Sequence, residues 1–311
     1  MSSEYTVSLK HLPRNPVPSV VSIGNFDGVH RGHQCLFSTQ QQLAKKHQLQ
    51  TQALVLFPHP AVVLGFEAPE MIMSIDDRLS LIKDLGIEHV FHLPFDVSLA
   101  QISARDFLHM MNVHMGMRIL CIGENTHIGK DREGSPPILK ELGKEMGIEV
   151  EVIPAMEVDH VACSSTLIRA LLRRGEIHIV NSLLGHRFFT RGTIGKGMGN
   201  GQKLGFPTAN FVNLETMIPG QGVYATFLME DGKIVPCATN VGFRPTISKG
   251  GSLVVETHVL DRRVDWVGKE VQLFWHKRIR MEKKFANKEA LSNQIQVDVV
   301  EIKKLFQSFK A

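Results

Sequence analysis

A regular alternation in the first half of the chain constrains the fold most, because short apolar runs there are separated by amphipathic stretches. Strands that alternate with helices favour a parallel sheet covered by helices on both faces. Two S-x-x-D sequences, beginning at Ser74 and Ser103, have the form of helix starts. The expected strands are Val20–Ile23, Ala53–Phe57, Val90–Leu93, Ile119–Ile122 and Val150–Ile153, and the expected helices are Cys35–Lys46, Leu79–Leu85 and Phe107–His114. We therefore predict a doubly wound α/β domain.

The pattern changes after about Gly185, where glycines cluster and short runs rich in Val, Thr and Phe lie between turn signals. Such runs favour antiparallel strands and a small β-barrel. The expected strands are Val223–Met229, Ile234–Thr239, Leu253–Leu260 and Val271–Trp275, followed by a helix over Lys288–Phe306 whose apolar stripe packs on the barrel. A chain of 311 residues is long enough to form two domains. We expect a boundary near residues 183–188, with domains 1–184 and 185–311.

Composition argues against several classes of protein. The net charge is +4, and the densest basic clusters are short, so a nucleic-acid partner is not expected. The four cysteines are scattered singly, which supports neither a disulfide framework nor a thiolate zinc site. The N-terminus lacks the layout of a signal peptide, and no apolar run approaches the roughly 20 residues that span a bilayer. We expect a cytoplasmic enzyme with small-molecule substrates and neither a membrane nor an obligate protein partner.

The most specific sequence in the first half runs from Gly24 to His33 and reads G-N-F-D-G-V-H-R-G-H. It follows an expected strand and opens an expected helix, where backbone N–H groups and the helix dipole favour an anionic phosphate. His30 and His33 form an H-x-G-H pattern, and Gly32 permits close backbone approach. Both imidazoles are therefore predicted to face one phosphate group.

With three further stretches in order, this half resembles the H-x-G-H nucleotidyltransferases, specifically the prokaryotic bifunctional riboflavin kinase/FAD synthetases. The stretches are F-P-H-P from Phe57, G-E-N-T-H-I-G from Gly123 and S-S-T-L-I-R from Ser164. The resemblance implies transfer of an adenylyl group from ATP to FMN, with His30, His33 and Arg169 as catalytic residues. It also implies that ATP phosphates are bound by Gly24, Asn25, Phe26, Asp27, Gly28, Ser164, Ser165 and Thr166, and the flavin by Pro58, His59, Pro60 and Asn125. The serine run also fits a simple helix N-cap, and both roles are compatible.

One segment departs from the family pattern. Thr126 and Ile128 stand where the family usually has two aromatic residues, whereas Asn125 and Gly129 are kept. Two interpretations stay open. Either the aromatic residues shape the flavin pocket and their loss weakens adenylylation, or they are packing residues that Ile128 replaces adequately.

The second half carries G-F-P-T-A-N, from Gly205 to Asn210, which resembles the P-T-A-N motif of riboflavin kinases. The chain contains neither a G-x-x-x-x-G-K-[ST] phosphate loop nor a G-x-G-x-x-G fingerprint. The resemblance implies a small β-barrel that binds ATP through Gly205, Pro207, Thr208 and Asn210. It also implies that Thr208 and Asn210 hold Mg²⁺, a hard cation that prefers oxygen ligands. Glu256, a carboxylate in an apolar strand, is implied as the base that activates the riboflavin hydroxyl.

The resemblance thus implies a bifunctional transferase that uses ATP and Mg²⁺ to make FMN from riboflavin and FAD from FMN. Three alternatives remain open from the sequence. One is a riboflavin kinase with weakened or lost adenylyltransferase activity, and another is an H-x-G-H transferase for a cytidylyl or pantetheine substrate. The third is a flavin-binding regulator without turnover.

Overall fold

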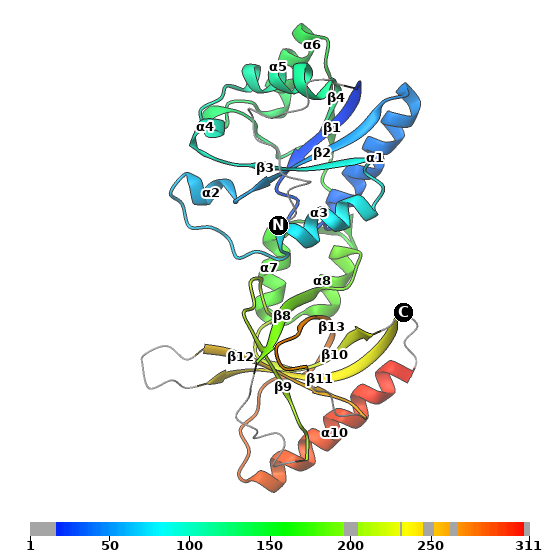
Figure 1. The fold of residues 1–311 in the computed structure, drawn as a ribbon, viewed down its shortest axis with the longest axis vertical. Helices are drawn as coiled ribbons and strands as arrows, with labels where there is room; N and C mark the ends of the chain where they lie inside the picture. Colours follow the sequence, from blue (N-terminus) through cyan, green and yellow to red (C-terminus); the bar gives the residue numbers. More distant parts are fainter. Residues whose placement is uncertain (1–16, 196–204, 231, 245–251, 262–265, 308–311) are drawn as a thin grey trace. The chain divides into compact units, whose positions relative to one another are not determined.

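The computed structural model describes residues 17–195, 205–230, 232–244, 252–261 and 266–307 (Figure 1). The chain divides into two compact units, Met1–Ser165 and Thr166–Ala311. Within the described part, no helix is long and apolar enough to cross a membrane.

The first unit is built on a five-stranded sheet in which every pair of neighbouring strands is parallel, in the order β3-β2-β1-β4-β5. The strands are β1 (Ser19–Gly24), β2 (Gln50–Phe57), β3 (His89–Pro94), β4 (Met117–Gly123) and β5 (Glu149–Ile153). The helical segments are α1 (Arg31–His47), α2 (Pro60–Val63), α3 (Ile75–Asp84), α4 (Val97–Ala100), α5 (Ala104–Met115), η2 (Lys130–Arg132) and α6 (Pro136–Met146). A short hairpin, β6 (Glu157–Val158) and β7 (Val161–Ala162), follows.

Helices pack on both faces of this sheet. Buried residues of α5 and α6, such as Phe107 and Leu139, form one hydrophobic cluster with Val21, Leu54 and Leu120 from the sheet. Helix α1 contacts β1, β2 and β4, but its buried residues are absent from that cluster. The predicted doubly wound α/β domain is therefore confirmed.

Both predicted helix starts are present. The Ser74 hydroxyl accepts a hydrogen bond from the Asp77 N–H at 3.2 Å, and the Ser103 hydroxyl accepts one from the Asp106 N–H at 3.0 Å. Each hydroxyl satisfies an N–H group that the first turn of a helix would otherwise leave without a partner.

The second unit contains two helices followed by a six-stranded barrel. The helices are α7 (Ser165–Arg174), whose first residue belongs to the first unit, and α8 (Ile177–Leu184). The barrel closes in the order β10-β11-β12-β9-β8-β13, and every neighbouring pair is antiparallel. Its strands are β8 (Phe189–Gly195), β9 (Ala209–Val212), β10 (Gly222–Glu230), β11 (Lys233–Arg244), β12 (Ser252–Val259) and β13 (Glu270–Arg280). The predicted barrel and terminal helix, α10 (Lys288–Gln307), are confirmed.

Hydrogen bonds join α8 to the barrel. The Asn181 side-chain amide donates to the Trp275 carbonyl at 2.9 Å, and its oxygen accepts from the Phe188 N–H at 2.7 Å. Trp275 is fully buried in the barrel, edge-on to Tyr224. These contacts place α8 with the barrel, in the unit that begins at Thr166. The boundary between the two activities at 184/185 stays a prediction.

An ion pair connects α10 to the barrel. The Arg280 guanidinium on β13 donates to both carboxylate oxygens of Asp298 on α10, at 2.8 to 3.0 Å, and Gln294 donates to the same carboxylate. The Asp298 side chain is only 4% exposed. Nearby, Val299 and Ile302 of α10 pack against Ala225 of β10.

Replacing Arg280 by methionine is expected to destabilise the second unit by about 3 kcal/mol, because it leaves a buried carboxylate without its counter-charge. This is the low end of the usual range, since the arginine is partly exposed. Urea unfolding with tryptophan fluorescence measures the change. The matched control is Arg191→Met, because the ion pair of Arg191 with Glu270 is exposed, and it should change the urea midpoint of unfolding little. Equal midpoints for the parent and Arg280→Met would contradict the expectation.

Candidate active sites

The sequence motifs of the first unit meet at one edge of the sheet. The Gly24 motif follows β1, the Pro58 motif follows β2, and the Gly123 motif ends β4. These three strands are neighbours and run parallel, so their carboxyl ends lie together. The chain leaves β1 toward β2 on one side, while β4 lies on the other side. Ligands of open parallel sheets bind at such a reversal of strand order.

The loop between β1 and α1 has a constrained backbone. Phe26 and Val29 adopt positive φ angles of 48° and 40°, which residues other than glycine rarely adopt. Both residues are buried, and the Val29 N–H donates to the Phe26 carbonyl at 3.0 Å, closing a turn. Strained backbone of this kind clusters at functional sites.

The two motif histidines lie against each other. Their rings stack with centroids 3.6 Å apart and planes 19° from parallel. A Cβ on Gly32 would approach the His30 ring to 3.1 Å, so the glycine leaves room for this packing. Phe26 lies edge-on to the His33 ring, with centroids 5.3 Å apart.

His33 is held in its neutral form. Burial, followed by the neighbouring His30 and Arg78, lowers the pKa of His33 well below the usual 6.5. Its Nδ1 atom is buried and has no hydrogen-bond partner among the described residues, and the same holds for Oδ1 of Asn25. Buried polar atoms are normally satisfied, so both atoms are available to a ligand.

The low pKa of His33 makes stability depend on pH. Below pH 6.5 the unfolded chain protonates this histidine while the folded unit resists, so the unfolded state binds more protons. We expect the free energy of unfolding of the first unit to rise with pH up to about 6.5 and then to level off for this group. Urea unfolding at several pH values measures the slope. His33→Gln should flatten it, and an unchanged slope in that variant would contradict the assignment.

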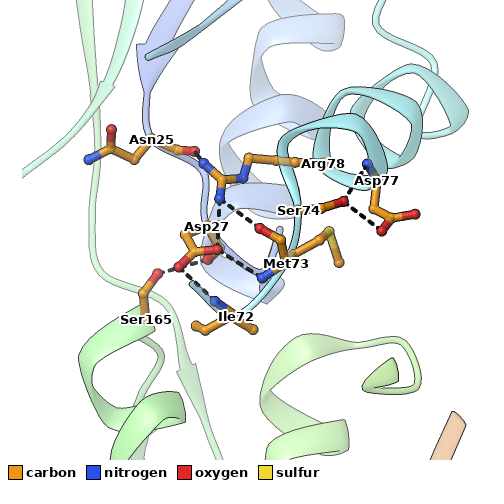
Figure 2. Close-up of polar contacts among 8 residues, drawn as sticks. All are labelled: Asn25, Asp27, Ile72, Met73, Ser74, Asp77, Arg78 and Ser165. Carbon is orange, nitrogen blue, oxygen red and sulfur yellow. Dashed lines mark hydrogen bonds and ion pairs between the residues drawn. The ribbon is translucent and has the colours of Figure 1, made fainter. Parts of the chain in front are cut away.

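Asp27 is buried and fully engaged within the protein. Its carboxylate accepts hydrogen bonds from the N–H groups of Ile72 and Met73, at 3.1 and 3.2 Å, and pairs with Arg78 at 2.9 Å (Figure 2). Its carbonyl oxygen accepts from the Ser165 hydroxyl at 2.8 Å. In this structure Asp27 and Ser165 therefore organise the loop. Direct contact of either with ATP stays a prediction.

The Cys163 side chain lies against the N-terminus of α1. The N–H groups of Arg31 and Gly32 hydrogen-bond the Cys163 thiol, and burial raises the pKa of that thiol. A neutral thiol thus uses two N–H groups at the N-terminus of this helix. Sequence reasoning missed both Cys163 and Arg78, because nothing near either residue marks it as a neighbour of the Gly24 loop.

The remaining predicted residues of this site are only partly placed. His59 is the N-cap of the short helix α2, which begins at Pro60, and its ring accepts a hydrogen bond from the Ala61 N–H at 3.2 Å. Pro58 directly precedes this cap. Asn125 is exposed just after β4. Thr166 and Arg169 belong to the second unit, and Arg169 is buried. The roles predicted for these residues at the adenylylation site stay predictions.

Ile128, one of the two departures from the family pattern, lies in the hydrophobic core. Ile128 is buried, belongs to the cluster beneath α5 and α6, and exchanges two backbone hydrogen bonds with Gly134. Isoleucine therefore fills a core position there. Thr126 is half-buried, and its N–H donates to the Gly123 carbonyl in a turn.

In the barrel, the predicted kinase residues form a polar row. Asn210 on β9 lies opposite Glu256 on β12, and Glu256 lies opposite Asn240 on β11. The neighbours of Glu256 along the strand, Val255 and Thr257, are buried in the barrel, so the three polar side chains share the outer face. Side chains opposite each other in neighbouring strands have Cβ atoms about 5 Å apart. This row joins the P-T-A-N motif to the predicted base.

His258 fixes the turn that precedes β9. Its Nδ1 atom lies 2.8 Å from the Pro207 carbonyl, so this nitrogen carries the proton and donates. The Phe206 ring lies edge-on to the His258 ring and packs against the cluster beneath α10. Thr208 is half-buried at this turn, and Gly205 adopts a positive φ of 85°.

Comparison with known proteins matches both halves. A family model described as FAD synthetase matches residues 12–167, and one described as riboflavin kinase matches residues 184–306. The bifunctional riboflavin kinase/FMN adenylyltransferase of Escherichia coli (strain K12) is 32% identical over 92% of each chain. The enzyme of the same name from Bacillus subtilis (strain 168) is 29% identical over 94% of each chain. A crystal structure titled a macrolide-efflux protein, from Streptococcus pneumoniae, superposes with a TM-score of 0.87 and 27% identity. It covers 98% of this chain and 100% of that one.

Each family model falls on the half of the chain that carries the corresponding motifs, and the relatives match from end to end. The chain therefore belongs to the bifunctional riboflavin kinase/FMN adenylyltransferase family.

Proposed function

We propose that this protein converts riboflavin to FAD in two steps, with one active site in each half of the chain. The observation that carries the proposal is the presence of both sets of motifs, each assembled by its own fold, in a chain matched along its length by bifunctional enzymes. We do not propose efflux, because the curated relatives and both family models name the two transferases.

In the first unit, a phosphate oxygen of FMN would attack the α-phosphorus of ATP, and the bond to the departing pyrophosphate would break. The nucleophile is already an anion near neutral pH, so positioning and charge stabilisation matter more than a base. The stacked His30 and His33 and the buried Oδ1 atom of Asn25 lie where the sheet edge would present the nucleotide. The Nδ1 atom of His33 suits a hydrogen bond to a phosphate oxygen, and Oδ1 of Asn25 can accept a hydrogen bond from a donor of the ligand.

In the barrel, the terminal ribityl hydroxyl of riboflavin would attack the γ-phosphorus of ATP, and ADP would leave. This nucleophile is a neutral alcohol, so it benefits from a base that accepts its proton. The half-buried Glu256 carboxylate is that base in our proposal, with Asn210 and Asn240 on its two sides.

Both reactions would use Mg²⁺, which neutralises phosphate charge in ATP chemistry. Among the described residues, no cluster of three or more His, Cys, Asp or Glu side chains forms a ready metal cage. The barrel offers oxygen donors instead, in the predicted ligands Thr208 and Asn210, the second of which lies in β9. That set fits a cation that binds few protein oxygens along with the phosphates of its substrate. We further propose that the enzyme works in the cytoplasm, where ATP is available.

The test is to incubate the purified chain with riboflavin, ATP and Mg²⁺ and to separate the flavins by chromatography. FMN followed by FAD is the expected result. FMN alone would limit the function to the kinase and would point to the Thr126 segment. No conversion would refute the kinase activity, and the same incubation with supplied FMN would then decide whether the first unit makes FAD.

A further inference from the structure

Arg78, on α3, is a buried arginine that donates three hydrogen bonds near the adenylylation motifs. Its guanidinium donates to the Asn25 carbonyl at 2.7 Å, to the Asp27 carboxylate at 2.9 Å and to the Met73 carbonyl at 3.0 Å (Figure 2). The Arg78 and Asp27 side chains are 3% and 6% exposed. The guanidinium contacts the Asn25 carbonyl through one terminal nitrogen and the other two acceptors through the second, a separation of donors that the compact ammonium of lysine does not provide.

Through Asp27, this pair joins three separate segments. The carboxylate accepts hydrogen bonds from the N–H groups of Ile72 and Met73, just before α3. The Asp27 carbonyl accepts one from the Ser165 hydroxyl at the start of α7. Figure 2 shows Asp27 at the centre of these contacts, with the Asn25 side-chain amide turned away from Arg78. The network therefore holds the main chain of the loop while leaving the Asn25 amide to a ligand.

A buried ion pair needs a reason beyond stability, because apolar residues of similar size often serve equally well. Here the loop it holds has positive φ angles at Phe26 and Val29, a conformation that persists only when its surroundings fix it. The same loop leads directly into His30 and His33. Arg78 thus holds the backbone that presents these groups, without belonging to the predicted substrate-binding set.

We propose that Arg78 is a positioning residue for adenylyl transfer: it fixes the loop between β1 and α1 through the Asn25 carbonyl and the Asp27 carboxylate. This inference rests on the function proposed for the first unit. It goes beyond that function by assigning a role in the reaction to a residue outside the H-x-G-H and S-S-T-x-x-R motifs.

The experiment compares Arg78→Lys and Arg78→Met with the parent. The matched control is Arg105→Met, since Arg105 lies in the same unit and its ion pair with Glu145 is exposed. Each full-length variant is assayed for adenylylation of supplied FMN, with kcat and KM for ATP, and for phosphorylation of riboflavin. Thermal unfolding followed by circular dichroism reports whether the first unit still unfolds cooperatively.

For Arg78→Lys we expect kcat for adenylylation to fall roughly 10- to 100-fold with little change in KM for ATP, because misplacement of about 1 Å can cost 100-fold in rate. Arg78→Met should lose at least as much. Riboflavin phosphorylation should stay within about twofold of the parent, as should both activities of Arg105→Met.

Two results would overturn the inference. One is adenylylation within about twofold of the parent in a folded Arg78→Lys variant. The other is loss of activity together with loss of cooperative unfolding of the first unit in both Arg78 variants, since Arg78 would then be purely structural. A parent enzyme that makes no FAD would instead refute the proposed function of that unit.

Discussion

Replacing Glu256 by glutamine is expected to abolish the formation of FMN from riboflavin while supplied FMN is still converted to FAD. Glutamine keeps the size and the hydrogen-bonding oxygen of the side chain, so the row with Asn210 and Asn240 should survive. It removes the basic carboxylate that would take the proton of the ribityl hydroxyl. Loss of a positioned general base typically costs about 10²- to 10⁴-fold in rate.

Two comparisons make this expectation sharp. Adenylylation of supplied FMN by the same chain reports that the rest of the protein is intact. Glu270→Gln changes a glutamate at the exposed start of β13 in the same barrel and should leave both rates near those of the parent. Kinase turnover that survives Glu256→Gln would show that Glu256 is not the base.

The fold was predictable from sequence where local signals were strong. Parallel strands buried on both faces produced continuous apolar runs, and Ser74 and Ser103 marked helix starts, so most elements of the first unit were located within a few residues. The strands β8 and β9 were not predicted. Gly192 lies within β8, and β9 begins inside the P-T-A-N motif; both sequences resemble turns, and only pairing with distant strands makes them extended.

The candidate sites were predictable to a similar extent. The Gly24 loop was recognisable because its glycines and histidines are contiguous in sequence. The ties of that loop to Arg78 and Cys163 were not, because they span 51 and more than 130 residues and depend on tertiary packing. Likewise, only the register of β9, β12 and β11 shows that Asn240 is a neighbour of Glu256.

His33→Ala should reverse the pattern of the Glu256 variant, with adenylylation lost and riboflavin phosphorylation retained. The structure gives His33 a buried Nδ1 atom without a partner, a stacked neighbour in His30 and a pKa well below 6.5. A neutral imidazole with a free polar atom suits a hydrogen bond to a phosphate oxygen, and the negative charge of bound ATP would favour its protonation. Removing one preorganised donor of this kind typically costs about 10²- to 10³-fold in kcat.

The measurement is FAD formation from supplied FMN and ATP, with riboflavin phosphorylation by the same preparation as the internal reference. His47→Ala is the matched control, because His47 lies exposed in the last turn of the same helix, α1. Its adenylylation rate should stay near that of the parent. FAD production by His33→Ala at the parent rate would remove His33 from the mechanism. The stacked pair would then act through His30 alone, and His30→Ala in the same assay would decide whether either ring takes part.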